Sequence, residues 1–495
     1  MLRGRLLRQL AATGPGRAGL ALFAVLALAS AGVVAAFPLD YGRTRWGNPA
    51  WWADNPKAVP PAWVAWFRRH RPARHRVLEG LQVERAASPQ RPGQGQAASP
   101  PAGAPGPGSP IVYSFSFVHD ADEPPTFLSL SVSDVTFRSR PPVITAVLTR
   151  PDGESLTLYR TVLRGPRPGE RPPFRRYETE PLRVLLSAEP AAATAVSRLL
   201  ETRYGLSVPA ERLRGQLEAA LFGVPAPDGS FAVLRGPYRA ELQVSLADPG
   251  DRVGRVRLVV GGSVYGLMGT DALGRDLAQG LLFGLPVALG IGLAASTIST
   301  TLGTGLGFFS GYLGGWVDTA IQRAADIVAN VPVLPLLIFI VFIGGSQLWL
   351  IILVLVAFSW PGLAILVRSM TLQLRSGQEV EAAQALGAPA WRVILRHIFP
   401  HTAPFILAQL VFFAPSAILA EAGLSFLGLG DPSIPTWGQI LEHGFRTGAV
   451  FLGYWWWVVP PGLLIVVAAL AFMLVSLGLE PALDPRLRGG RPWRY

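Results

Sequence analysis

Several residue types are nearly absent from this 495-residue chain, and each absence narrows its chemistry. There is no cysteine, which excludes disulfides and thiolate metal sites. The only lysine, Lys57, lies in "NPKAVP", so the chain lacks the glycine-rich, lysine-containing loop that cradles nucleotide phosphates. Catalytic serine arrangements and carboxylate pairs are not discernible. We therefore expect a chain that is not an enzyme and binds no cofactor of its own.

Charge is also scarce. Half of the residues are apolar, only 15% are charged, and several uncharged stretches reach 20 residues or more, which is typical of a membrane protein. The net charge of +12 comes almost wholly from arginine, a balance that fits either nucleic acid or an anionic membrane surface. Because the arginines cluster beside the apolar runs, we expect the lipid bilayer as a partner and no nucleic acid.

The first uncharged run lies between Arg17 and Asp40 and follows an arginine-rich start. It fits an uncleaved spanning helix or a secretory signal peptide, since "GVVAAF" offers small residues to a peptidase. The run is longer than a signal-peptide core, which favours the anchor. Residues 1–37 are therefore predicted to be a cytoplasmic N-terminus and a first transmembrane helix.

Residues 38–265 have the composition of a globular insertion between the first and second spans. A Pro/Gly/Ala/Ser/Gln-rich run at 87–110 predicts a flexible linker. After it, "IVYSFSFV", "LSLSVSDVTF", "AELQVSL" and "VRLVVGG" predict strands, "VITAVLTRPDGESLTLYRTVL" a hairpin and "AAATAVSRLLETRY" a helix. The insertion is thus expected to be an α+β domain, outside the cytoplasm if the first helix is retained.

Residues 266–480 predict a five-helix core. Uncharged intervals run from Leu277 to Val317, Ile327 to Val367, Ile398 to Ala420 and Thr447 to Leu479, and the polar "GGSQ" divides the second into a helical hairpin. With the first helix, the fold class is an all-α polytopic membrane protein with six transmembrane helices and the inserted α+β domain.

The arginines predict the orientation of these spans. Segments assigned to the cytoplasm hold Arg323, Arg368, Arg375, Arg392, Arg396, Arg486, Arg488, Arg491 and Arg494, whereas the outer connection 425–446 holds one arginine and the "GGSQ" turn none. This is the bias of the positive-inside rule. Both termini, the basic tail 481–495 and the loop 371–400 are therefore predicted to be cytoplasmic.

The cytoplasmic loop predicts a helix, a glycine stop and a second helix. Ser376 and Glu379 have the spacing of a capping box, and Val380, Ala383 and Leu386 are predicted to share one face. Gly387 is placed to end the helix in a left-handed conformation. Pro389 suits the first turn of the second helix, and Pro400 marks the entry into the next span.

Glu381, Ala382, Ala383 and Gly387, followed by Ile398, Phe399 and Pro400, resemble the EAA loop of ABC-importer permease subunits, although Phe399 replaces the usual leucine. "GTDALGRD" at 269–276, "AILAEAGLSFLGLG" at 417–430 with "PTWG" at 435–438, and "ALDPRLR" at 482–488 resemble the second permease of dipeptide, oligopeptide and nickel importers. The resemblance covers about 266–488 and the first helix, and does not extend to the large insertion.

The resemblance implies a prokaryotic plasma (inner) membrane protein and a set of partners. These are a second homologous permease, two cytoplasmic ATPase subunits that hold ATP-Mg, and an extracytoplasmic solute-binding protein. The loop residues Glu381, Ala382, Ala383, Gly387, Ile398 and Pro400 would couple ATP hydrolysis to alternating access for peptides or related solutes.

Other ionisable residues have two interpretations each. "GTDALGRD" predicts a capped interfacial helix, with Asp271, Arg275 and Asp276 at an outer gate as the alternative. Glu421 is either a snorkelling carboxylate at a span's end or part of a translocation path. His397 and His401 have no nearby carboxylate pattern for zinc, so no metal site is expected.

Two other functional classes remain open from the sequence alone. One is a membrane-tethered structural or sensory protein that acts through its extracytoplasmic domain. The other is a membrane-embedded hydrolase, for which no nucleophile and base pattern is present.

Overall fold

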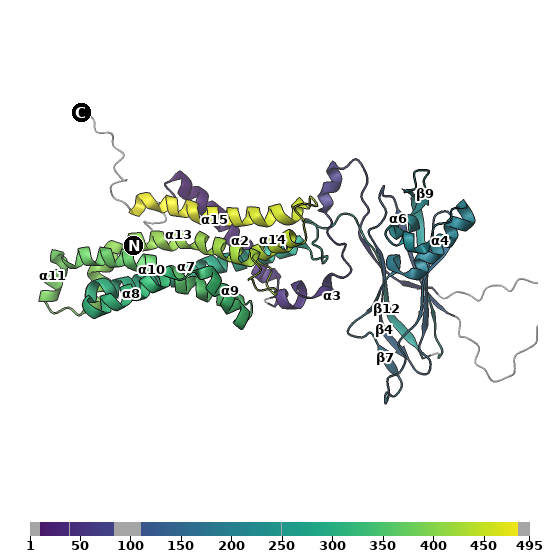
Figure 1. Ribbon diagram of the computed structural model, residues 1–495, viewed down its shortest axis with the longest axis horizontal. Helices are drawn as coiled ribbons and strands as arrows, with labels where there is room; N and C mark the ends of the chain where they lie inside the picture. The colour runs from purple at the N-terminus through teal and green to yellow at the C-terminus, as the bar shows by residue number, and fades with distance from the viewer. Residues whose placement is uncertain (1–9, 39, 84–109, 249, 484–495) are drawn as a thin grey trace, which may run out of the picture. The chain divides into compact units, whose positions relative to one another are not determined.

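The computed structural model describes residues 10–38, 40–83, 110–248 and 250–483. The predicted linker at 87–110 and the basic tail at 481–495 lie almost wholly outside the described residues. The chain divides into two compact units (Figure 1). We call residues 1–51 with 277–495 the helical unit, and residues 52–276 the sheet unit.

The helical unit is built almost entirely from α-helices. In chain order they are α2 (Gly14–Ala36), α7 (Leu277–Leu313), α8 (Gly315–Asn330), α9 (Val333–Gly344), α10 (Leu348–Arg375), α11 (Gln378–Ala385), α12 (Ala390–Val393), α13 (Phe399–Phe426), α14 (Trp437–Arg446) and α15 (Trp455–Leu483), and the short α3 (Pro49–Trp52) ends at the border with the sheet unit. A π-helical turn, Ile394–Ile398, joins α12 to α13.

Five helical segments among the described residues are long and apolar enough to cross a membrane: Gly14–Ala36, Leu277–Leu313, Leu348–Arg375, Ala390–Phe426 and Trp455–Leu479. The predicted hairpin differs in its first arm. There α8 and α9 meet at 82°, with Pro332 at the break, and α9 alone has 12 residues, about 18 Å of helix. The two helices count as a sixth span only if the bent pair crosses the membrane as a single segment. The presence of six spans therefore stays a prediction.

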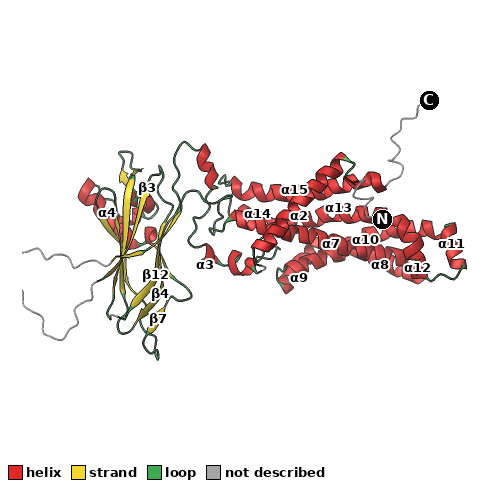
Figure 2. Ribbon diagram, turned by 180° about the vertical axis from the view of Figure 1, so that it is seen from behind, coloured by secondary structure: helices red, strands yellow, loops and turns green. Residues whose placement is uncertain are grey.

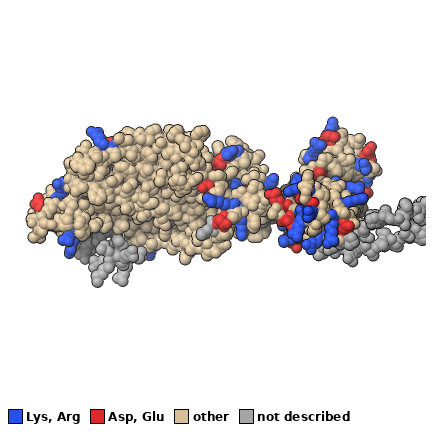
Figure 3. All heavy atoms as spheres, turned by 90° about the horizontal axis from the view of Figure 1, so that it is seen from below, with Lys and Arg blue, Asp and Glu red and all other residues tan. Residues whose placement is uncertain are grey.

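The surface of the helical unit fits a lipid environment. Figure 3 shows side chains without charge over most of its length, with charged residues gathered toward its ends. Many large apolar side chains are exposed there, among them Leu293, Phe309 and Phe342. Exposed apolar surface on this scale is stable in lipid but not in water.

Glycines allow α7 to pack closely on its neighbours. A Cβ added at Gly307 would lie 2.7 Å from the carbonyl oxygen of Ala364 on α10, and Gly303 faces the same helix. Gly292 instead faces α13, whereas Gly305 faces open space. Small residues at helix contacts let the backbones approach, as membrane helices require.

In its described residues, the sheet unit contains two five-stranded antiparallel sheets and a two-stranded one (Figure 2). One five-stranded sheet has the order β1 (Arg76–Glu79), β12 (Arg252–Val260), β4 (Leu128–Phe137), β7 (Phe174–Arg176), with β8 (Leu182–Leu185) also paired to β4; the other has the order β2 (Leu81–Val83), β3 (Ile111–His119), β11 (Gly236–Ser245), β5 (Val143–Thr149), β6 (Ser155–Val162). Strands β9 (Gly223–Pro225) and β10 (Phe231–Val233) form the small sheet, and the helices are α4 (Pro190–Tyr204), α5 (Ala210–Leu213) and α6 (Leu217–Leu221).

The strands and the helix predicted in the insertion are confirmed. Strand β5 alternates buried and half-buried residues, as a strand with one face on a core requires, and pairs with β6 through a turn at Gly153, whose φ is +85°. Residues of both five-stranded sheets, α4 and α6 form a single hydrophobic core. Helix α4 ends at Gly205 in the left-handed conformation.

The border between the units lies later than position 38, where the insertion was predicted to begin. The Tyr41 hydroxyl donates to Gln279 of α7 over 3.2 Å, and the Trp46 ring packs where a side chain at Gly280 would lie. Residues up to Trp51 group with the helical unit.

Candidate functional site

The loop between α10 and α13 forms a helix–turn–helix whose first helix begins differently from the prediction. Gly377 is the N-cap of α11, and no side chain caps it. The Ser376 hydroxyl donates to the Gln373 carbonyl of α10 over 3.2 Å, so the predicted capping box with Glu379 is not formed. Glu379 instead lies 3.5 Å from His401 on the surface.

Helix α11 has one buried side and one exposed side. Val380 and Ala383 are buried in a cluster with residues of α7, α10, the π-turn and α13. The Gln384 amide donates to the hydroxyl of Tyr312 on α7 over 3.1 Å. Leu386, predicted to share the buried face, is 89% exposed because the helix ends at Ala385 and the chain turns away.

Gly387 ends α11 as predicted. Its φ is +76°, its N–H donates to Gln384, and the N–H of Ala388 donates to Ala383 over 3.0 Å. These two bonds are those of a Schellman motif, which needs a residue in the left-handed conformation at this position. No atom lies near a Cβ added at Gly387, so its backbone conformation alone demands glycine.

The second helix of the loop continues into the next candidate span. Pro389 is the N-cap of α12 rather than a residue of its first turn, and Pro400 lies in the first turn of α13. Of the predicted coupling residues, Ala383 and Ile398 are buried, whereas the others face outward. Those exposed are Glu381, Ala382, Gly387 and Pro400.

Glu421 lies on α13, buried, with 3% of its surface exposed. The Ser425 hydroxyl donates to its carboxylate over 2.6 Å, and the Thr436 hydroxyl lies 3.4 Å from Ser425. Thr436 is the N-cap of α14 and accepts a hydrogen bond from the N–H of Gln439. This burial argues against a snorkelling carboxylate, because the group faces the joint between α13 and α14 rather than solvent.

The "PTWG" motif packs α14 tightly on α13 and α7. A Cβ added at Gly438 would lie 2.5 Å from the carbonyl oxygen of Ala422, so only glycine fits the contact. The Trp437 indole donates to the carbonyl of Leu281 on α7 over 2.9 Å. The two sequence motifs at 417–430 and 435–438 therefore form one packed joint.

The "GTDALGRD" segment is a buried turn in the sheet unit, not the predicted capped helix. The Asp271 carboxylate accepts hydrogen bonds from the N–H groups of Leu273 and Arg275, over 2.9 and 2.8 Å, and pairs with the Arg275 guanidinium. Asp271 and Arg275 are both buried, and Asp276 closes the segment through a backbone bridge with Thr270. The charges of Asp271 and Arg275 satisfy each other.

The sequence reading missed an ion pair between α8 and α10. The Arg368 guanidinium donates to both carboxylate oxygens of Asp318, over 2.5 Å each. The Ser310 hydroxyl of α7 also donates to Asp318 and accepts from Gln322 over 3.1 Å. The signal was an isolated acid and an isolated base bordering apolar runs, a pattern that calls for a partner.

Within the described ranges, no three His, Asp or Glu side chains gather in a way that would hold a metal ion. We take as the candidate functional site the loop between α10 and α13, with its exposed face, its buried face and the helices that the buried face contacts.

The family match lies within the helical unit. Residues 303–489 match the family model described as binding-protein-dependent transport system inner membrane component. The chain is 34% identical to the dipeptide transport system permease protein DppC of Bacillus subtilis over 44% of this chain and 68% of that protein. It is 36% identical to the glutathione transport system permease protein GsiD of Pectobacterium atrosepticum over 47% of this chain and 76% of that protein.

A solved structure titled as an inward-facing conformation of the MetNI methionine ABC transporter aligns with 43% of this chain and 97% of its own, at 19% identity and a TM-score of 0.33. The assignment rests on the sequence matches, which confirm the resemblance found in the motifs. The chain belongs to the family of binding-protein-dependent transport system inner-membrane components, the permease subunits of ABC importers.

Proposed function

We propose that this chain is one permease subunit of an ATP-driven importer of peptides or related solutes. The importer also contains a second homologous permease, two cytoplasmic ATPases that bind ATP-Mg, and an extracytoplasmic solute-binding protein. The two relatives named above are permease proteins of dipeptide and glutathione transport systems, which supports a peptide-like solute. The membrane-tethered sensory alternative has no comparable support.

The observation that carries the proposal is the two-sided loop. Its exposed face presents Glu381 and Ala382 on α11. Two apolar side chains flank the Gly387 turn on the same loop, Leu386 before it and Trp391 after it, and they are 89% and 61% exposed. An exposed apolar patch rimmed by polar groups marks a protein contact site. We assign this face to the ATPase subunit.

The buried face supplies the mechanical connection. Val380 and Ala383 pack in one cluster with Phe308 of α7, Leu363 of α10 and Ile406 of α13. A displacement of α11 by a closing ATPase would therefore act directly on three helices of the helical unit. Such rigid-body movement of packed helices is a recognised route to alternating access.

Orientation follows from the arginines. We propose that the loop and both termini face the cytoplasm and that the sheet unit lies on the other side. Glu421 would act by fixing α14 against α13, at the joint described above. An outer-gate role for Asp271, Arg275 and Asp276 would have to act through the shape of their turn, because the first two charges are buried and paired.

The test is assembly with the ATPases. Co-expression of this chain with its genomic neighbours and purification through a tag on this chain should yield a complex with the ATPases. Glu381→Lys reverses an exposed charge on the docking face, and we expect it to lower solute-stimulated ATP hydrolysis at least ~10-fold while the protein still inserts.

The matched control is Glu211→Lys, the same charge change at an exposed position of the sheet unit. It should leave hydrolysis within about twofold of wild type. Equal activity of wild type and Glu381→Lys in transport and ATP hydrolysis would remove the loop from the coupling path.

A further inference from the structure

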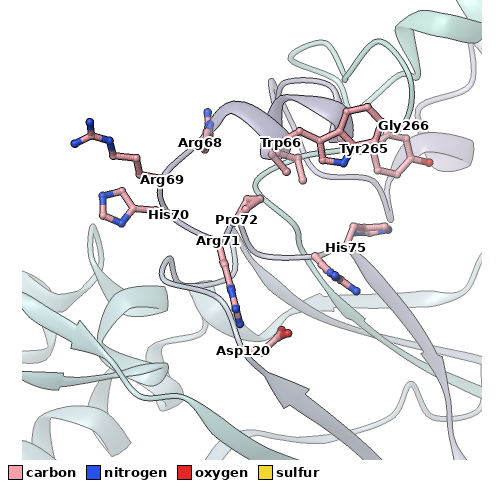
Figure 4. A pocket seen from close by; sticks show the side chains of 14 residues that line it. Trp66, Arg68, Arg69, His70, Arg71, Pro72, His75, Asp120, Tyr265 and Gly266 are labelled. Atoms are coloured by element: carbon pink, nitrogen blue, oxygen red, sulfur yellow. The ribbon is translucent and has the colours of Figure 1, made fainter.

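The sheet unit contains a cavity that the family resemblance does not account for. It has a volume of about 640 Å³, within the range of small-molecule sites, and is lined mainly by residues 62–75 and 264–266 (Figure 4). Most of this segment lies in the stretch "WFRRHRPARHR", which runs from Trp66 to Arg76, the first residue of β1. None of these residues belongs to the helical unit.

The lining of this cavity, which we call the arginine pocket, is strongly cationic. Its charged side chains are four arginines and one carboxylate: Arg68, Arg69, Arg71, Arg74 and Asp120. Arg68 pairs loosely with Glu123 at 3.6 Å, and Asp120 lies 3.9 Å from Arg76, outside the lining. Within the described residues, Arg69, Arg71 and Arg74 make no ion pair. The pocket thus holds uncompensated positive charge.

The fold holds these arginines in place through the backbone. The Arg71 N–H donates to Asp122 over 2.7 Å, and its carbonyl accepts from the N–H of Asp122. Arg74 forms a parallel bridge with Val264. Because these bonds use only main-chain groups of the arginines, the guanidinium groups stay available to a ligand. Figure 4 shows Arg71 directed to the same side of the pocket as Asp120.

Polar and aromatic groups complete the pocket. The Nδ1 atom of His75 is buried and has no hydrogen-bond partner within the described residues, and its ring packs edge-on to Tyr265. A buried ring nitrogen without a partner is rare unless water or a ligand meets it. Trp66, which lines the pocket, and its neighbour Phe67 are 84% and 80% exposed.

Arginine is the residue suited to oxyanions, because its planar fork donates two parallel hydrogen bonds to a phosphate. Exposed aromatic rings beside basic side chains are, in addition, the combination found where proteins meet membrane interfaces. The sheet unit is tethered to candidate spans on both sides, since α2 precedes it and α7 begins directly after Asp276.

We propose that the arginine pocket binds a phosphate-bearing anion, and that the exposed rings of Trp66 and Phe67 favour the headgroup of an anionic phospholipid over free phosphate. The guanidinium groups of Arg71 and Arg74 hold the phosphate oxygens. The rings lie against the acyl–headgroup boundary. Such a contact anchors the sheet unit to a membrane surface independently of the transport proposal.

The experiment uses the full chain, purified in a neutral detergent and analysed by native mass spectrometry. Three probes are titrated: phosphatidylglycerol, phosphatidylcholine and inorganic phosphate. Lipid also binds the spans, so the pocket is isolated by comparing variants. In Arg71→Gln/Arg74→Gln we expect the affinity for phosphatidylglycerol to fall at least about tenfold, equivalent to about 1.4 kcal/mol. Phosphatidylcholine binding should not change.

The matched control is Arg140→Gln/Arg164→Gln, which removes the same charge from exposed arginines outside the pocket. Its phosphatidylglycerol affinity should equal that of wild type. Should the pocket variant fail to fold, Arg69→Gln, at the exposed rim, should still lower the affinity about threefold. Inorganic phosphate that binds wild type and is lost in the pocket variant would support the site and assign it to a soluble anion. Equal binding by all variants of both anionic probes would overturn the proposal.

Discussion

Gly387 shows how one residue's backbone sets the geometry of the proposed docking face. Because its φ is +76° and the Schellman bonds depend on it, Gly387→Val should strain the turn by about 1 kcal/mol or more. The exposed Leu386 and Trp391 would then be displaced relative to the buried side of α11. We expect solute-stimulated ATP hydrolysis of the reconstituted complex to fall severalfold.

Gly165→Val is the control, since Gly165 has open space around it and no left-handed φ. It should behave as wild type in the same hydrolysis measurement. Unaltered coupling in Gly387→Val would show that docking tolerates a reoriented turn.

The neighbourhood of Gly387 also shows what local sequence can predict. A left-handed C-cap is determined by a few adjacent residues, and the glycine before Pro389 indicated it correctly. The capping box failed for an equally local reason. The Ser376 hydroxyl has a competing acceptor in the preceding helix, the Gln373 carbonyl, and serine readily takes such a bond.

His119 makes the stability of the sheet unit depend on pH. The ring is buried, with its Nε2 atom 3.0 Å from the Glu123 carbonyl. Burial lowers the pKa of His119; the hydrogen bond to the Glu123 carbonyl and the charge of Asp120 oppose this shift, while Arg76 and Arg235 add to it. The unfolded chain, with a histidine pKa of about 6.5, therefore takes up the proton first as the pH falls. Stability should be full above about pH 7 and should decline below it.

Thermal unfolding of the full chain, followed by circular dichroism between pH 8 and pH 5, tests this sign. Burial also lowers the pKa of His75, so that residue contributes in the same direction. His119→Gln keeps a donor for the Glu123 carbonyl and should reduce the loss of melting temperature at low pH. The substitution of the exposed His70 by Gln should not. A melting temperature that rises toward pH 5 in wild type would contradict the assignment.

At the scale of elements, the pair of Asp318 and Arg368 ties α8 to α10. Its side chains are 19% and 28% exposed, so solvent screens the pair only in part. Asp318→Asn should lower the free energy of unfolding by about 1 kcal/mol, because a bidentate, charge-assisted contact is lost. Since α10 leads directly into α11, we also expect weaker coupling of ATP hydrolysis to transport.

The control for this pair lies on the same helix. Asp326→Asn removes a carboxylate that is 58% exposed and 3.8 Å from Arg323, a geometry that contributes little. Its melting temperature in lipid nanodiscs should stay close to wild type. The double variant Asp318→Arg/Arg368→Asp, in which the two charges are exchanged, should recover part of the stability. If neither Asp318→Asn nor the charge exchange changes the melting temperature, the ion pair is dispensable for stability.

Helices could be predicted from the sequence where a single uncharged interval forms a single helix. The helices that became α2, α7, α10, α13 and α15 follow from uncharged intervals of sufficient length. The bend between α8 and α9 could not be predicted from the sequence. Hydropathy does not report the direction of a helix, and the presence of Pro332 does not determine the angle between the two helices. Asp318 and Arg368 are 50 residues apart in the sequence. A single sequence does not show which distant residues come into contact, so this pair could not be predicted.

At the scale of the whole molecule, orientation is testable because the chain has no native cysteine. Single cysteines at the exposed positions Ser376 and Glu180 sample the loop and the sheet unit. In intact cells, the Glu180→Cys protein should react with an impermeant thiol reagent and the Ser376→Cys protein should react only after permeabilisation. Labelling of Ser376→Cys from outside would reverse the proposed topology and with it the docking role of the loop.

The sheet unit itself has two parts, a base and a sandwich. In the base, the Ala62 N–H donates to Gly266 over 2.9 Å, and the N–H of Thr270 donates to Val59 over 2.9 Å. The sandwich, formed by the described residues between 76 and 260, has its own core. Its ends are close together, because a Cβ added at Gly262 would lie 2.4 Å from the backbone nitrogen of His75. The sandwich is therefore removable in principle without opening the base.

Deleting residues 76–260 and joining His75 to Gly261 with a short Gly/Ser linker should leave a membrane-inserted subunit that still assembles with its ATPases, because the helical unit and the loop are untouched. We propose that the sandwich recruits the solute-binding protein. The binding-protein concentration that gives half-maximal transport should then rise severalfold, while the maximal rate changes less. If the sandwich only stabilises the subunit, its deletion should lower the melting temperature and leave the half-saturating concentration of binding protein unchanged. That result in transport titrations would eliminate the recruitment role.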